Sequence, residues 1–60
     1  MKVVTLMTAD DKELVVFVEQ VSCLKALGAD RCEIALTGGF TYIVKGALAD
    51  LLSKIKAAAT

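Results

Sequence analysis

The chain has 60 residues, 57% of them hydrophobic, and its acidic and basic residues balance to zero net charge. A single domain of this size buries only about 60% of the surface of its unfolded chain. Such domains are usually stabilised by disulfides, a metal or oligomerisation. With two cysteines and no histidine, the sequence lacks the ligands of a usual zinc site. We therefore predict no metal and no cofactor, and the large apolar content favours a homo-oligomer.

The distribution of charged and apolar residues argues against several classes of partner and of targeting segment. Basic and acidic residues are interspersed along the chain and form no block of one sign, whereas a nucleic-acid-binding domain normally carries a basic stripe. No segment reaches the ~20 apolar residues of a transmembrane helix. The short apolar run at residues 3–7 is followed closely by the charged residues 10–13, which is not typical of a signal sequence. We expect a cytoplasmic protein with reduced thiols and no membrane partner, and the charge distribution disfavours a nucleic-acid partner.

Residues 2–8 and 14–18 predict a β-hairpin. Both segments are rich in β-branched and aliphatic residues, and the polar residues 9–13 separate them. Because residues 14–18 are apolar at every position, we expect this strand to be covered on both faces. Val15 and Phe17 are therefore candidate interface residues.

The middle of the chain predicts three further strands. Residues 21–27 fit either a strand or a helical turn, since their apolar positions match both periods. A strand is favoured because the turn residues 28–30 and the alternating segment 31–36 follow. Gly38-Gly39 predicts a two-residue hairpin turn, after which residues 40–44 form the returning strand.

The last segment, residues 47–58, predicts an amphipathic helix. Aliphatic side chains recur there at i, i+3, i+4 and i+7. The expected core face of the helix consists of Leu48, Leu51, Leu52 and Ile55. The predicted fold class is α+β: an antiparallel β-meander of four to five short strands, with a small half-barrel as a variant, followed by one C-terminal helix.

A two-residue turn at Gly38-Gly39 fixes which residues share a face. Ile34 then lies opposite Ile43, and both faces of the hairpin carry large apolar side chains. The face that does not hold Ile34 carries Phe40, Tyr42 and Val44. Because one helix covers one face, we expect these three residues to form an interface. Three alternatives remain for what covers this face: a second copy of the protein, closure of the sheet on itself, or an external ligand.

The two cysteines can be placed in the same way. With a two-residue turn at Gly28-Ala29, Cys23 pairs with Ile34, and Cys32 becomes its diagonal neighbour on one face. Such a diagonal spans roughly 7–8 Å, which is too far for a disulfide. We predict two small, buried, unbridged hydrophobic residues.

No arrangement of residues indicates catalysis. There is no histidine to act as a base, and no motif activates a serine or cysteine nucleophile, so we predict that the chain is not an enzyme. Asp10, Asp11 and Glu13 are acids of the kind common in turns. Phe40 and Tyr42 share one strand face, which would allow stacking on a base or a planar ligand.

From Val16 to Ile55 the pattern resembles the FlbD family, short cytoplasmic proteins encoded among bacterial flagellar genes. The resemblance rests on the strand ending Ile34-Ala35-Leu36-Thr37, the turn Gly38-Gly39, the strand Tyr42-Ile43-Val44-Lys45 and the closing helix. Small phage-encoded proteins have a similar size and pattern. The resemblance implies no catalytic residue.

Two functional hypotheses follow. The first is a non-enzymatic, homo-oligomeric assembly or regulatory module that acts through protein–protein contacts, as a phage or bacterial accessory protein. The alternative is a small ligand- or nucleic-acid-binding module that uses the face of Phe40 and Tyr42.

Overall fold

The computed structural model describes residues 2–60; its five strands and its α-helix follow the predicted order, and a short 3-10 helix that was not predicted lies between the second and third strands. They are β1 (Val3–Met7), β2 (Glu13–Phe17), the 3-10 helix η1 (Val18–Gln20), β3 (Val21–Gly28), β4 (Arg31–Leu36), β5 (Thr41–Lys45) and α1 (Leu48–Ala59). All neighbouring strands pair antiparallel. The α+β class, with a β-meander and one C-terminal helix, is confirmed, and the ambiguous segment 21–27 lies in a strand.

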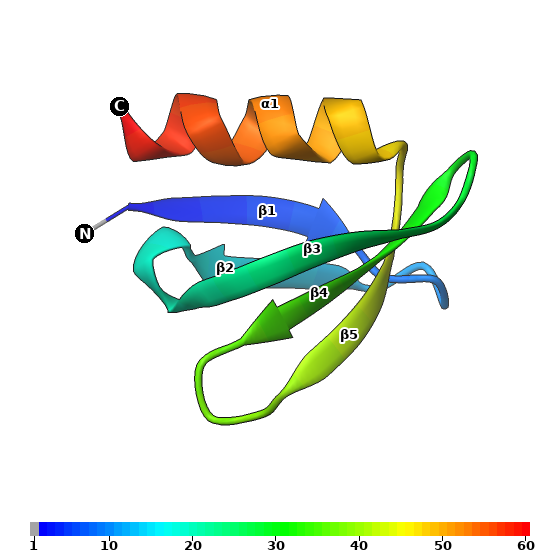
Figure 1. Ribbon diagram of the computed structural model, residues 1–60, viewed down its shortest axis with the longest axis horizontal. Coiled ribbons are helices and arrows are strands. Elements are labelled where there is room, and N and C mark those ends of the chain that lie inside the picture. Colours follow the sequence, from blue (N-terminus) through cyan, green and yellow to red (C-terminus); the bar gives the residue numbers. More distant parts are fainter. Residues whose placement is uncertain (1) are drawn as a thin grey trace.

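The strands form two sheets, β1-β2 and β3-β4-β5. The sheets join where Thr8 forms an isolated bridge with Val44 and the Ala9 N–H donates to the Ile43 carbonyl at 2.9 Å. Figure 1 shows α1 running along one side of the molecule, next to β1. The two sheets and the helix therefore enclose one interior.

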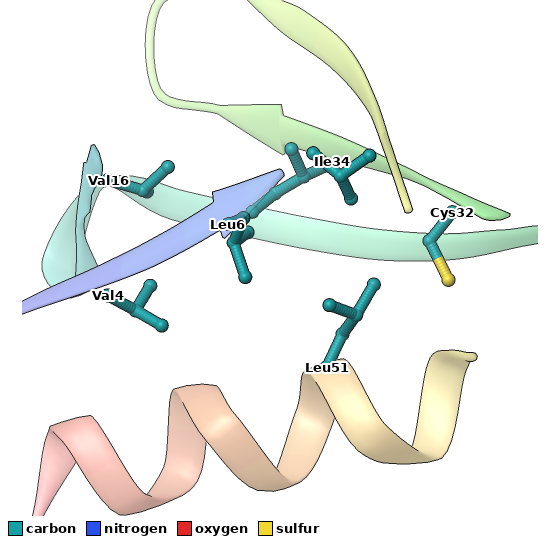
Figure 2. Close-up of a cluster of buried hydrophobic side chains, with 7 residues drawn as sticks. Val4, Leu6, Val16, Cys32, Ile34 and Leu51 are labelled. Carbon is teal, nitrogen blue, oxygen red and sulfur yellow. The ribbon is translucent and has the colours of Figure 1, made fainter. Parts of the chain in front are cut away.

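Side chains from both sheets and from the helix fill that interior. The buried residues are Val4, Leu6, Val16, Cys32, Ile34, Val44 and Leu51. Figure 2 shows members of this cluster on β1, β2, β4 and α1 around a shared space. Along β1 the burial alternates as strand geometry requires, with Val4 and Leu6 inside and their neighbours in the strand exposed.

Leu36 and Phe40 pair at the end of the β4–β5 hairpin, which leaves a three-residue loop, Thr37–Gly39; the predicted two-residue turn is wrong. The Leu36 N–H donates to the Phe40 carbonyl at 2.7 Å, which closes the loop one residue earlier on the β5 side. Gly38 and Gly39 have φ angles of 96° and 87°. Glycine adopts this left-handed region readily, so the Gly-Gly pair serves the longer loop as well as the shorter one.

This extra loop residue shifts the register by one, so Ile34 pairs with Tyr42 rather than with Ile43. A shift of one residue moves every side chain of a strand to the opposite face. Val44 therefore points inward and is fully buried, while Ile43 lies on the outer face opposite Glu33. The β4–β5 hairpin has one apolar face, and the expected second apolar face does not exist.

The β3–β4 register also differs from the predicted one. Cys23 lies opposite Ala35 and Cys32 opposite Ala26, with irregularities near both ends of β3. The two cysteines consequently lie on opposite faces: Cys32 is fully buried, whereas Cys23 is exposed. The prediction of a buried thiol is confirmed for Cys32 and wrong for Cys23.

The strand β2 is covered on one face only, so the expectation of two covered faces is wrong. Val16 is buried and Leu14 is half-buried, but Val15 and Phe17 are exposed. The cause is that β1 and β2 form an outer wall of the molecule, and α1 packs against β1, β3 and η1. Nothing in residues 2–60 lies over the outer face of this wall.

The helix packs through a stripe rotated from the predicted one. Leu51 is buried, and Ile55 and Ala58 pack against the core. Leu48 and Leu52, both predicted to be in the core, are 38% and 44% exposed. The Lys2 Nζ donates to the carbonyl of Ala59 at 2.6 Å, where the helix dipole favours a cation, so α1 is held at its C-terminal end.

Gly46 forms the corner between β5 and α1. Its φ angle is 125°, and its N–H donates to the Asp30 carbonyl at 2.7 Å. A Cβ atom built there would lie 3.1 Å from a Leu51 methyl carbon. The corner therefore needs glycine for two reasons: the backbone adopts a positive φ angle there, and a side chain at this position would crowd Leu51 in the core.

We predict that Gly46→Ala lowers the free energy of unfolding by about 1–3 kcal/mol, because it combines a left-handed φ with crowding of Leu51. Gly28→Ala is the matched control, since a Cβ there meets nothing within 4 Å, and its effect should stay within about 0.5 kcal/mol. Urea denaturation followed by circular dichroism measures both. Equal losses in the two variants would contradict this account of the corner.

We also predict that a maleimide reagent labels one thiol per native chain. Cys23 should react quickly because it is exposed, and Cys32 should react only after denaturation. Mass spectrometry counts the labels, and native Cys23→Ser should take up none. Fast labelling of Cys32 in that variant would show that the core is more open than described.

Candidate functional site

The exposed apolar side chains indicate where a partner can bind. Within residues 2–60 the large apolar residues that are exposed are Val3, Met7, Val15, Phe17, Leu27, Phe40, Tyr42, Ile43, Leu48 and Leu52. Scattered exposed residues of this kind are normal, but a contiguous group marks an interaction site. The first four belong to β1 and β2, which are paired strands.

These four residues share one surface, the outer hairpin face. Val3 pairs with Phe17, Thr5 with Val15, and Met7 with Glu13. Side chains directly opposite one another on antiparallel strands lie side by side on the same face. The outer hairpin face therefore consists of Val3, Thr5, Met7, Glu13, Val15 and Phe17.

Most of this face is apolar and open to solvent. Its four apolar side chains are between 43% and 54% exposed. Glu13 is its one charged residue and lies at one end, beside Met7. The inward residues of the same strands are in the core. The hairpin therefore carries apolar side chains on both faces, but only its inner face packs against the rest of the chain.

The backbone adds a free strand edge to this face. The Thr8 N–H donates to the Lys12 carbonyl at 2.7 Å, and the Val18 N–H donates to the Lys2 carbonyl at 3.0 Å. Because alternate residues of an antiparallel strand bond to opposite neighbours, Val15 and Phe17 direct their N–H and C=O groups away from β1. In the described part of the chain β2 pairs with β1 alone. Proteins usually protect such an edge by a charge, a bulge or a cover.

The predicted interface residues do not form a single surface. Val15 and Phe17 lie in the outer hairpin face, whereas Phe40 and Tyr42 belong to the β4–β5 hairpin and are 62% and 39% exposed. Val44 is fully buried and cannot contact a partner in the folded chain; the changed register is the reason.

Sequence reasoning missed Val3 and Met7. Their strand is apolar at four of five positions, Val3, Val4, Leu6 and Met7. That pattern puts apolar side chains on both faces of β1, and it could have predicted an exposed apolar face on this strand.

Two acidic side chains of the turn between β1 and β2 bond to neighbouring groups of the same chain. Asp11 has a φ angle of 66° and forms an ion pair with Lys45. The Thr8 hydroxyl donates to Asp10 and accepts the Lys12 N–H at 3.0 Å. No three potential metal-ligating side chains come together within residues 2–60.

A shallow concavity of about 420 Å³ lies between this turn and β5. It is lined by Thr8, Ala9, Asp10, Glu33, Thr41, Tyr42 and Ile43. Tyr42 belongs to this concavity, which shares no residue with the outer hairpin face. We call this second feature the edge concavity.

Within residues 2–60, the outer hairpin face and the edge concavity are the two candidate sites. None of the helices within residues 2–60 combines the length and the apolar character needed to cross a membrane. Comparisons with protein-family models, with curated proteins and with solved structures gave no match.

Proposed function

We propose that the chain is a non-enzymatic protein–protein interaction module that assembles with a second copy of itself through the outer hairpin face. The observation that carries this proposal is the grouping of Val3, Met7, Val15 and Phe17 on one solvent-exposed sheet face. Contiguous apolar surface of this kind is the usual mark of an association site.

Burial of this face would supply a free energy of the same order as the cost of association. Full burial of a side chain of this size is worth about 1.5–3 kcal/mol. Because about half of the surface of each of these four exposed side chains is already covered within one chain, roughly 1 kcal/mol per side chain remains to be gained. A symmetric dimer doubles the number of side chains, so the total falls within the ~4–15 kcal/mol range of the association cost.

The charge distribution supports a second copy as the partner. The chain has zero net charge, so two copies do not repel one another over long range. A twofold axis that lies between the two faces, perpendicular to the strands and over the central pair Thr5–Val15, would place Glu13 of one copy near the Val3–Phe17 end of the other. The two carboxylates are then far apart, and the apolar residues meet in a self-complementary contact.

The size of the chain supports assembly as well. A domain of 60 residues has little core with which to stabilise itself, and oligomerisation is one of the usual remedies. The lack of histidine and the burial of Cys32 leave few groups suited to acid–base or nucleophilic chemistry, which supports a non-enzymatic role.

We predict that Val15→Lys converts a dimer into a monomer. The substitution puts two ammonium groups near each other at the twofold axis, so the dissociation constant should rise about a hundredfold or more. Size-exclusion chromatography with light scattering at micromolar concentration measures the mass. The circular dichroism spectrum should not change, because Val15 faces solvent within one chain.

Leu52→Lys is the matched control. Leu52 is 44% exposed, as Phe17 is, but it lies on α1, so this variant should remain dimeric. A wild-type chain that stays monomeric at every concentration, or a loss of the dimer in Leu52→Lys but not in Val15→Lys, would overturn the proposal.

A further inference from the structure

The edge of β5 is left partly unpaired where the β1–β2 turn departs from it. The Leu36 N–H bonds to the Phe40 carbonyl, which sets Phe40, Tyr42 and Val44 to bond with β4. Thr41 and Ile43 therefore direct their backbone groups to the opposite edge. The Ile43 carbonyl accepts the Ala9 N–H at 2.9 Å, and the chain then turns away.

Three backbone groups remain at this edge without a partner in residues 2–60: the N–H and C=O of Thr41 and the N–H of Ile43. They lie on residues that line the edge concavity. Exposed strand-edge groups are a template for an added strand, since they offer backbone hydrogen bonds in the spacing of a sheet.

The shape of the edge concavity suits a short segment of chain. Its volume of about 420 Å³ falls within the ~300–1,000 Å³ of ligand sites. The turn residues Thr8, Ala9 and Asp10 form one wall, and β5 forms the other. A strand laid antiparallel along β5 would continue the line that β1 leaves at Thr8.

The negative charge of the edge concavity favours peptide segments that carry a positive charge. Its lining holds two carboxylates, Asp10 and Glu33, and no cationic residue. Lys25 lies opposite Glu33 on β3, yet the ion pair found in residues 2–60 joins Lys45 to Asp11. The Glu33 carboxylate is therefore available to a cation from outside the chain.

We infer that the edge concavity binds an extended peptide segment of another protein by strand addition to β5, with a Lys or Arg side chain directed toward Glu33. A peptide residue opposite Thr41 places its side chain on the face of Thr41, Ile43 and Glu33, because side chains of paired residues share a face. The inference is independent of the dimer and concerns a different surface.

The chain carries its own reporter for this test. Tyr42 is its single tyrosine and there is no tryptophan, so tyrosine fluorescence reports on the edge concavity. The probe is a blocked hexapeptide of alternating valine and lysine. We expect a saturable change in fluorescence with this peptide, and the Val15→Lys variant, which tests the dimer, should bind it equally well.

Two altered peptides separate the elements of the inference. Glutamate in place of lysine should weaken binding about tenfold through loss of the charge-assisted contact. N-methylation of the backbone should abolish binding because it removes the edge hydrogen bonds. The inference would be overturned if either altered peptide, or lysine amide alone, bound as tightly as the valine–lysine peptide.

A matched pair of variants tests the residue named. Glu33→Gln should lower the affinity for the lysine peptide about tenfold, whereas Glu19→Gln, on η1 and outside the edge concavity, should leave it unchanged. Absence of any saturable fluorescence change with the wild-type chain, or equal affinities in the two variants, would also overturn the inference.

Discussion

The backbone bond from Leu36 to Phe40 sets the register on which the interior of this domain depends. It makes the loop three residues long, which turns Val44 inward beside Cys32 and turns Ile43 outward. With Val44 inside, β4 and β5 present one apolar face, and the β1–β2 hairpin and α1 can both pack on it. Gly46 then allows the chain to turn from β5 into α1 so that Leu51 completes the same core.

This arrangement explains why the apolar surface is found on β1 and β2. The β4–β5 sheet places its charged residues, such as Glu33 and Lys45, on the outside, whereas the outer hairpin face has Glu13 alone. A free edge along β2 borders that face. Exposed apolar side chains beside an unpaired edge are hazardous for a protein that stays monomeric, and assembly removes much of the hazard.

Sequence periodicity was sufficient to predict the order of the five strands and the α-helix, but not the 3-10 helix at Val18–Gln20 or the registers of the strands. The strands alternate and α1 repeats every 3.6 residues, and both patterns are local. The register depends on whether Gly38-Gly39 spans a two- or a three-residue loop, and glycine permits both. The apolar run Leu14–Val18 was equally ambiguous, because an uninterrupted run does not reveal whether its second face meets the same chain, a partner or solvent. Val15 and Phe17 are exposed, as contact with a partner requires, whereas the exposed Val3 and Met7 were not predicted, and Val44, which was predicted to lie in an interface, is buried.

The central claim is that the outer hairpin face contacts its counterpart on a second copy. Isotope-filtered NMR on a mixture of labelled and unlabelled chains tests it most directly, because nuclear Overhauser effects between copies identify the touching side chains. We predict such effects among the methyl groups of Thr5 and Val15 and between the Phe17 ring and the Met7 methyl of the other copy. Effects that arise only from Leu48 and Leu52 on α1 would contradict the account, as would none at a concentration where the assembled form predominates.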